Sequence, residues 1–193
     1  LLEFLSERGI VQVAAPVRTI SGETIWNDGH RDWHLEPWKP GNADFLVDPN
    51  SEKLQNAMIS LADWHQAAVL WTPPRDSATW FSSSIAGPSS AITDRIMRID
   101  YWSGAPQVEL RRALSKEPES AWTESATIVL AHFDRLAAAA RVDLHRLSQV
   151  QFSRQPCLRD LWSDHVLFTG NHVTGLIDPT ACRNDNVAVD LAR

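Results

Sequence analysis

Residues 156–179 read PCLRDLWSDHVLFTGNHVTGLIDP, and they place three aspartates and His165 between apolar runs too short for helices. Residues 166–168 and 173–177 have the length and composition of short strands. Gly170-Asn171 between them is a tight-turn pair, so we expect a β-hairpin here. Because the rest of the chain offers no comparable acidic cluster flanked by strands, this hairpin is the starting point for fold and function.

A turn centred on Gly170-Asn171 would set Asp178 opposite Ser163 or Asp164, with His165 beside it. Asp160 lies a few residues before the first strand, on the connection that leads into it. The pattern therefore predicts that carboxylates and an imidazole converge at one end of the hairpin. Like charges gathered in a partly buried place usually need a cation or a shared proton.

Composition limits the classes of protein. The 193 residues suffice for one sizeable domain or two small lobes, and 44% hydrophobic and 22% charged residues are typical of a globular protein. A net charge of -6 argues against nucleic acid or an anionic membrane as the main partner, but it leaves room for a nucleotide held locally. Two cysteines, Cys157 and Cys182, are too few for a disulfide framework or a cysteine metal site, so we expect reduced thiols in a cytoplasmic protein.

The two ends of the chain suggest a piece of a longer protein. It opens on Leu1 within an apparent helix and without an initiator Met, and it stops at Arg193 just after residues 187–192 begin an apolar periodic segment. No run approaches the roughly 18 apolar residues of a membrane span.

The first 41 residues combine one helix with a region rich in strand-forming residues. Residues 1–8 have helical spacing and end at Gly9. Three short runs are separated by turn residues and predict a three-stranded antiparallel meander; they are residues 17–20, 23–26 and 33–36. Residues 37–41, PWKPG, would end this sheet and lead out of a first lobe.

The remainder is mainly helical. Asp48-Pro49 would start a helix whose apolar face follows Leu54, Met58, Leu61, Ala62, His65, Ala68 and Val69. A Ser-, Gly- and Pro-rich loop is expected at 76–90, and shorter helices at 91–101 and 106–115. The longest helix, about 120–147, has the apolar periodicity of a central core helix.

This order of elements predicts an α+β fold with two lobes. Residues 1–40 would form a partial N-terminal β lobe and hinge, and residues 41–193 a helical C-terminal lobe that carries the catalytic hairpin. A cleft between two lobes is a usual place for a ligand.

The chain resembles the family of aminoglycoside phosphotransferases and choline/homoserine kinase-like enzymes, which share the protein-kinase fold. The family's catalytic segment reads roughly H-G-D-x-x-x-x-N-[IVL]-[IVL], then a hairpin, then I-D-[FWP]. Leu158-Arg159-Asp160 stands in the H-G-D place, His165-Val166-Leu167 at the Asn spacing, and Ile177-Asp178-Pro179 in the second motif.

Three further segments support the resemblance. Residues 187–192, VAVDLA, are similar to the family's P-x-x-D-L-A element, and residues 35–41, LEPWKPG, to its hinge ending in a P-G pair. Residues 61–65, LADWH, are similar to its helix carrying L-A-x-x-H. Each motif alone is weak, but their order and spacing along the chain are fairly specific.

The resemblance implies ATP-dependent phosphorylation of a small-molecule hydroxyl, with Mg²⁺ as cofactor. Asp160 would be the catalytic base, and Asp178 would bind the metal that bridges the nucleotide phosphates. His165 stands where the family has its second metal ligand, Asn; imidazole suits Mn²⁺ better than Mg²⁺, and Asp164 could supply an oxygen instead. Adenine would bind backbone groups at the hinge, near Glu36, Pro37 and Trp38.

The chain departs from the family pattern at Leu158, Arg159 and His165. The phosphate-covering loop and the ion-paired lysine of the small lobe have no counterpart in the sequence and would precede Leu1. These departures keep a second hypothesis open, a catalytically silent kinase-like scaffold that binds a ligand or partner. A third, less favoured hypothesis is a metal-dependent hydrolase built on the same Asp/His cluster.

Other interpretations of the same residues also remain open. Asp160 could cap a loop, Asp178 could start a turn before Pro179, and His165 could bond to a neighbouring aspartate instead of a metal. His65 is expected to be a hydrogen-bonded core histidine. Asp190 is expected to brace the catalytic segment, and Arg159 to contact a phosphate or to pair with Asp160 or Asp190. The acceptor substrate and the oligomeric state cannot be read from the sequence.

Overall fold

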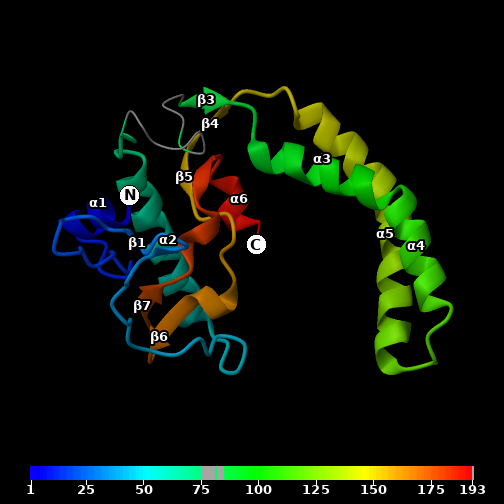
Figure 1. Ribbon diagram of the computed structural model, residues 1–193, viewed down its shortest axis with the longest axis horizontal. Helices are drawn as coiled ribbons and strands as arrows, with labels where there is room; N and C mark the ends of the chain where they lie inside the picture. Colours follow the sequence, from blue (N-terminus) through cyan, green and yellow to red (C-terminus); the bar gives the residue numbers. More distant parts are fainter. Residues whose placement is uncertain (75–80, 82–84, 193) are drawn as a thin grey trace. The chain divides into compact units, whose positions relative to one another are not determined.

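The computed structural model describes residues 1–74, 81 and 85–192. Contacts divide the chain into two compact units: unit 1 comprises residues 1–85 and 154–193, and unit 2 comprises residues 86–153 (Figure 1). Each unit is described separately. The lobe boundary expected after residue 40 stays a prediction. The loop expected at 76–90 lies largely outside the described residues.

Unit 1 combines helices with three short antiparallel strand pairs. Its helices are α1 (Leu2–Glu7), α2 (Ser51–Ala68) and α6 (Ala188–Leu191), with the 3₁₀ turns η2 (Ser163–His165) and η3 (Pro179–Ala181). Its strands are β1 (Trp26–Asn27), β2 (Asp32–Trp33), β5 (Gln155–Cys157), β6 (Val166–Thr169), β7 (His172–Leu176) and β8 (Arg183–Asp185).

The hairpin predicted from residues 166–177 is confirmed as β6 and β7. The register pairs Val166 with Leu176 and Thr169 with His172, with an irregularity between Leu167 and Phe168. Two earlier segments join this hairpin through backbone hydrogen bonds: Asn42 exchanges bonds of 2.9 Å with Phe168, and Leu176 N–H donates to Gln12 at 2.9 Å. The hairpin therefore holds together parts of the chain that are far apart in sequence.

Helix α2 lies alongside β5 and β7 in unit 1 (Figure 1). It begins two residues later than expected, because the side chain of Asn50, and not Asp48, caps it by accepting the Lys53 N–H at 2.9 Å. The buried face is also rotated from the predicted one. Its buried residues are Lys53, Ser60, Leu61, Trp64, Ala67 and Ala68, whereas Leu54, Met58 and Val69 are exposed.

The rotated face of α2 has two physical causes. Trp64 is fully buried and is the largest side chain in the core of the unit. Because its burial removes so much apolar surface from water, the face of α2 that carries Trp64 is the one that packs inward. Lys53 is buried with its ammonium 2.9 Å from both Asp44 and Asp48, which fixes the segment that precedes the helix. The spacing of apolar residues does not predict a buried lysine, because Lys53 is buried only through its ion pairs with two aspartates.

The hydrophobic core of unit 1 gathers around Trp64 and the hairpin. It consists of Leu5, Ile10, Val13, Leu61, Trp64, Ala67, Ala68, Leu158, Val166, Phe168, Val173, Leu176 and Cys182. Leu158, which stands in the place of the family histidine, is thus a packing residue.

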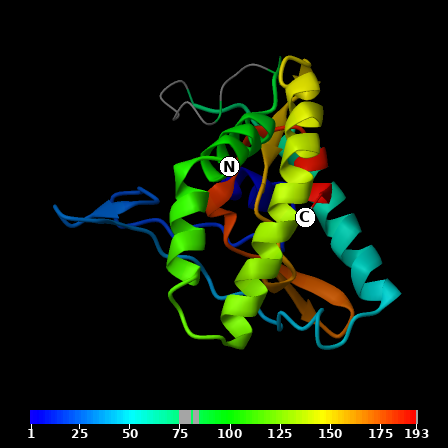
Figure 2. The ribbon, with the colours of Figure 1, turned by 90° about the vertical axis from the view of Figure 1, so that its right-hand side faces the viewer.

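The three-stranded meander predicted for residues 17–36 is wrong in extent. Only Trp26 and Asn27 pair with Trp33 and Asp32 as strands, while single bonds from Val17 N–H to Leu35 O and from Thr19 N–H to Glu23 O continue the pairing. Figure 2 shows β1 and β2 extending away from the rest of unit 1. A two-stranded ribbon with little to pack against is marginal, which explains the short strands.

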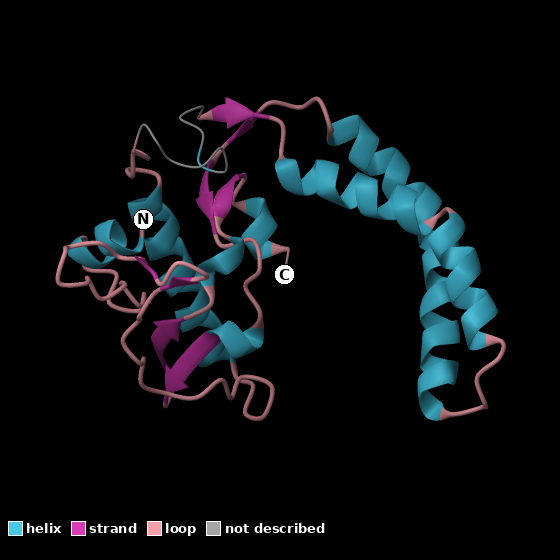
Figure 3. Ribbon diagram, in the orientation of Figure 1, coloured by secondary structure: helices cyan, strands magenta, loops and turns pink. Residues whose placement is uncertain are grey.

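Unit 2 is almost wholly helical (Figure 3). Its elements are β3 (Ala86–Gly87), α3 (Ser90–Trp102), α4 (Ala105–Leu114), α5 (Ala121–Leu147) and β4 (Phe152–Ser153). All three helices match the expected positions, and Ser89 and Ser120 cap α3 and α5 through their side chains. No helix among the described residues has the length and hydropathy to cross a membrane.

The prediction that α5 is a central core helix is wrong. Helix α5 packs against α3, but Leu130 is the one buried residue it contributes, and Trp122, Val129 and Leu136 are more than half exposed. The apolar periodicity was read correctly, but a unit of three helices has too little interior to cover so long a stripe.

Candidate active site

The loop after β5 carries Asp160. Its carboxylate Oδ1 accepts a hydrogen bond of 2.7 Å from the Trp162 indole N–H, which orients the side chain. Its carbonyl oxygen lies 2.7 Å from Nδ1 of His165. The side chain is half-buried, so it can exchange a proton with a ligand while its direction is fixed.

His165 ends the turn η2 and links Asp160 to Asp178. A carbonyl oxygen only accepts hydrogen bonds, so Nδ1 of His165 must be the protonated nitrogen. In the neutral ring this leaves the lone pair on Nε2, which lies 3.9 Å from Oδ2 of Asp178. The neutral ring is therefore held in the tautomer whose Nε2 can bind a cation.

Asp178 follows β7 in the left-handed conformation, with φ 55° and ψ 60°. Its Oδ1 accepts a hydrogen bond of 2.6 Å from the Thr180 hydroxyl. Hydrogen bonds from the hydroxyl and backbone N–H of Thr180 hold the pKa of this carboxyl below its usual range, with a smaller contribution from His165. Asp178 is half-exposed and ionised at neutral pH, as a metal ligand must be.

The expected pairing of Asp178 opposite Asp164 agrees with the observed register, because Ile177 N–H donates to His165 O at 2.9 Å. The side chain of Asp164 is exposed and accepts a bond of 2.9 Å from the Ser163 hydroxyl. The structure brings the His165 ring within 3.9 Å of the Asp178 carboxylate.

Backbone strain marks the same place. Among the described residues, two that are not glycine have a positive φ: Arg159, at 66°, and Asp178, at 55°. Such conformations cost about 1–3 kcal/mol each and persist where the surroundings enforce them, which is common at functional sites.

Asp190 braces the loop that carries Asp160, as expected. Its fully buried carboxylate accepts the backbone N–H groups of Leu158, at 2.9 Å, and Arg159, at 2.6 Å. Nε2 of His65 lies 2.8 Å from the same carboxylate, so His65 is the hydrogen-bonded core histidine that its position suggested. The partnership of these two side chains is a feature that the sequence did not reveal.

His65, Cys157 and Asp190 offer ligand atoms within 4.8 Å of one another. Burial, together with the carboxylates of Asp190 and Asp185, raises the pKa of the Cys157 thiol far above its usual range. Because a metal would require the thiolate, and because Asp190 is already engaged by two backbone N–H groups, these residues fit a structural network better than a metal site.

Glu36, Pro37 and Trp38, which are predicted to form the hinge, follow the β1–β2 ribbon in the chain. Glu36 pairs with His34 at 3.2 Å, whereas Pro37 and Trp38 are exposed, Trp38 almost completely. A pocket of about 410 Å³ connects this region with the residues that follow Asp178. It is lined by Leu1, Leu2, Glu3, Pro16, Thr24, Ile25, His34, Glu36, Phe81, Pro179, Thr180 and Cys182.

Gly41 ends the segment that is predicted to form the hinge. Its φ of 105° suits glycine, and a Cβ there would lie 2.4 Å from Thr174 Oγ1 and 2.6 Å from the Phe168 carbonyl oxygen. The Pro-Gly pair noted in the sequence therefore has a packing reason, since the segment after the hinge passes directly against the hairpin.

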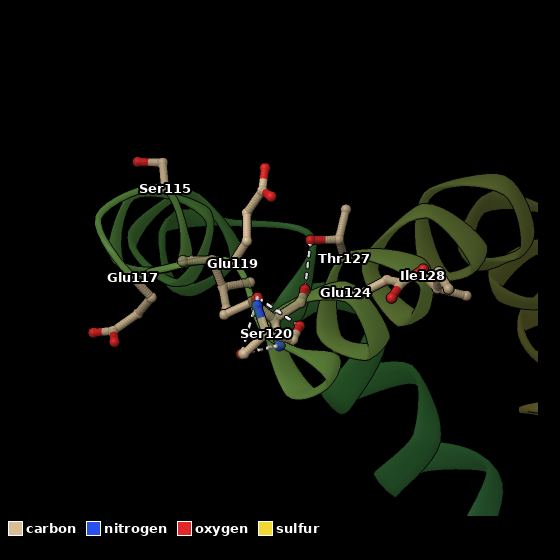
Figure 4. Close-up of a pocket in the computed structure, with 9 residues that line it drawn as sticks. Ser115, Glu117, Glu119, Ser120, Glu124, Thr127 and Ile128 are labelled. Carbon is tan, nitrogen blue, oxygen red and sulfur yellow. Dashed lines mark hydrogen bonds between the residues drawn. The ribbon is translucent and has the colours of Figure 1, made fainter.

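Unit 2 has its own hollow of about 850 Å³ at the connection between α4 and α5 (Figure 4). Ser120 and Thr123 on its wall cap α5 through reciprocal bonds, and Thr127 donates to the Thr123 carbonyl. The remaining polar residues of the wall are exposed. These side chains serve the helix end, and none of the predicted site residues lines the hollow.

Comparison with known proteins decides the family. The model of the phosphotransferase enzyme family matches residues 1–193. The chain belongs to this family. Its fold is that of the protein kinases, as expected, and the α+β composition agrees. A search of curated proteins finds no match.

The chain is also similar in structure to an aminoglycoside phosphotransferase from Alicyclobacillus acidocaldarius subsp. acidocaldarius DSM 446. The TM-score is 0.57 at 19% sequence identity, and the similarity covers 99% of this chain and 54% of the other. The chain thus spans about half the length of that protein, and the similarity supports the fold.

Family membership gives the arrangement a context. A phosphotransferase site needs a carboxylate at the acceptor and carboxylates at a metal. Asp160, before the hairpin, and Asp178, after it, stay the predicted residues for these two places. The sequence missed Thr180, which sets the protonation of Asp178, and Asp185, which pairs with Arg159. A hydroxyl two residues after a predicted metal ligand was the available signal for Thr180.

Proposed function

We propose that this protein transfers the terminal phosphoryl group of ATP to a hydroxyl group of a small molecule. The observation that carries the proposal is the chain of contacts from Asp160 through His165 to Asp178, in a member of the phosphotransferase enzyme family. A base for the acceptor and an anionic metal ligand are the parts that phosphoryl transfer requires of this segment.

In this proposal Asp160 orients the acceptor hydroxyl and accepts its proton. The Trp162 indole holds the carboxylate in place, so little reorganisation is needed when the acceptor binds. Asp178 and His165 hold the metal, with Asp164 as a further oxygen donor. When bound, Mg²⁺ or Mn²⁺ would neutralise charge on the nucleotide phosphates.

The metal donors favour a particular ion. A carboxylate with one imidazole is a better set for Mn²⁺ than for Mg²⁺, which prefers oxygen ligands. Because Nδ1 of His165 is tied to the Asp160 carbonyl, Nε2 is the nitrogen available to a cation. We therefore propose Mg²⁺ as the usual cofactor, with Mn²⁺ as the tighter-binding ion.

The nucleotide would occupy the pocket beside the hinge. Its wall includes Glu36 at one side and Pro179 and Thr180, next to Asp178, at another. Backbone groups of Glu36, Pro37 and Trp38 would bond to adenine. We further propose a cytoplasmic location, consistent with the two free cysteines, and no nucleic-acid or membrane partner.

A catalytically silent scaffold is the alternative. It is favoured by Leu158, a core residue in the place of the motif's histidine, and by the substitutions at Arg159 and His165. Calorimetry of the full-length protein with ATP and either Mg²⁺ or Mn²⁺ separates the two. The kinase requires metal-dependent nucleotide binding that is stronger with Mn²⁺, whereas nucleotide binding indifferent to metal, or none, would favour the scaffold.

A further inference from the structure

Arg159 occupies an unfavourable backbone position immediately before Asp160. Its φ of 66° is the left-handed conformation, in which glycine is at ease and a long side chain is not. The related motif has glycine at this place. A residue that bears this strain needs compensating contacts, and Arg159 makes them through both its side chain and its backbone.

The side chain of Arg159 is largely buried and lies against the strand β8. Its Nε is 3.7 Å from Oδ2 of Asp185, a carboxylate with no solvent exposure. Asp185 is itself fixed, because it pairs with Gln155 across β5 and β8 and accepts the Asn186 N–H at 2.9 Å. An ion pair with a fully buried carboxylate is only weakly screened by solvent, so it restrains Arg159 effectively.

The backbone of Arg159 is held from the opposite direction. Its N–H donates to the buried Asp190 at 2.6 Å. One residue later, the Asp160 carbonyl accepts the Nδ1–H of His165. The peptide groups on either side of the Arg159–Asp160 peptide are therefore both anchored, and the path of the backbone between them decides where the Asp160 carboxylate and the His165 ring point.

We propose that Arg159 is a positioning residue, which sets the orientation of Asp160 and His165 by tying their loop to Asp185 on β8. This proposal rests on the proposed function for its effect on turnover, but its structural part stands without it. The pair also joins the loop before Asp160 to the strand that follows Asp178, so it fixes the two halves of the site relative to each other.

The test compares Arg159→Gly with the double variant Arg159→Gly/Asp185→Asn in the full-length protein. Glycine relieves the strain but takes the guanidinium away from the buried Asp185 carboxylate, and the asparagine then removes the charge of that carboxylate. If Arg159 only stabilised the fold, the double variant would regain both the stability and the site geometry of the wild type. If Arg159 positions the site, the site geometry stays altered in the double variant, because the contact between the loop and β8 is still missing. Arg31→Gly, at an exposed turn, controls for the substitution itself.

The first measurement is the ¹⁵N NMR signature of the His165 ring, which reports the protonated, hydrogen-bonded Nδ1 whether or not the protein turns over ATP. We expect both Arg159 variants to lose this signature, while the double variant regains the wild-type urea midpoint. The second is metal-dependent ADP release from ATP, expected to fall roughly 10- to 100-fold in both variants with nucleotide affinity unchanged.

The outcomes are distinguishable. A wild-type His165 spectrum in the double variant would overturn the proposal. If the wild-type protein releases ADP, an equal rate of ADP release by the double variant would overturn it too. A wild-type protein without ADP release, whose double variant still loses the His165 signature, would refute the proposed function and leave the positioning role in place.

Discussion

Nδ1 of His165 lies 2.7 Å from the carbonyl oxygen of Asp160, and this contact fixes the imidazole ring relative to the loop that carries Asp160. It assigns the proton to Nδ1 and leaves Nε2 facing Asp178 at 3.9 Å. His165 departs from the family's asparagine, yet the structure gives it a defined orientation. The departure is therefore compatible with an active site whose metal preference has changed.

We expect His165→Asn to shift metal preference. Replacing imidazole with an amide oxygen donor should weaken Mn²⁺ binding relative to Mg²⁺ by roughly 10-fold or more. Titration calorimetry with each ion in the presence of ATP measures the ratio. His172→Asn, an exposed histidine of the same hairpin, serves as the control and should leave the ratio unchanged. A ratio unaffected by His165→Asn would remove His165 from the metal site.

Asp190→Asn should destabilise the protein. Asparagine keeps one accepting oxygen, so its N–H₂ group must face either the Leu158 or the Arg159 N–H, and His65 loses its anionic partner. Disrupting such a buried network costs about 3–5 kcal/mol in free energy of unfolding, which urea denaturation would detect. Asp143→Asn breaks an exposed i,i+3 pair on α5 and should change stability by less than about 0.5 kcal/mol. Equal effects of the two variants would contradict the bracing role.

Gly41→Ala should also lower stability. The new Cβ would approach the Thr174 hydroxyl at 2.4 Å and the Phe168 carbonyl at 2.6 Å, in addition to the strain at φ 105°. Overpacking and strain together suggest a loss of about 2–5 kcal/mol. Gly29→Ala has a similar φ, 91°, and open space around it, so it isolates the strain. Urea denaturation of both variants gives two unfolding midpoints, and the difference between them measures the effect of the close contact between Gly41 and the hairpin.

Both thiols should be unreactive in the folded protein at pH 8 and reactive in urea. Burial raises the pKa of Cys182 to about 12 and raises that of Cys157 as well, so neither forms a thiolate. Since the unfolded chain loses these protons from about pH 8.5, stability should decline as pH rises from there toward 12, by up to about 1.4 kcal/mol per pH unit and thiol. Cys182→Ala should reduce that slope. Rapid labelling of both thiols at pH 8 without denaturant would contradict their burial.

Local sequence signals predicted much of the fold. The hairpin was readable because Gly170-Asn171 separates two short apolar runs, and the register follows from that turn. Helix positions in unit 2 were readable from serine caps and apolar periodicity. Both signals act within a few residues, so they need no knowledge of distant partners.

Long-range pairings were the part that the sequence could not supply. The buried face of α2 depends on Lys53 meeting Asp44 and Asp48, and the short ribbon β1–β2 depends on what lies beside it. At the site, the structure places Arg159 beside Asp185 on β8, a partner that spacing along the chain did not indicate. Spacing along the chain indicates which residues gather, whereas tertiary packing decides which atoms face each other.

We propose that Asp178 binds the metal ion of a phosphotransferase. The most direct measurement is ADP release from ATP by the full-length protein with Mg²⁺ or Mn²⁺, before and after Asp178→Ala. Asp63→Ala, at an exposed position on α2, is the matched control. We predict a loss of roughly 1,000-fold, equivalent to several kcal/mol of charge stabilisation, with the control unaffected. Unchanged metal-dependent turnover in Asp178→Ala would contradict the account.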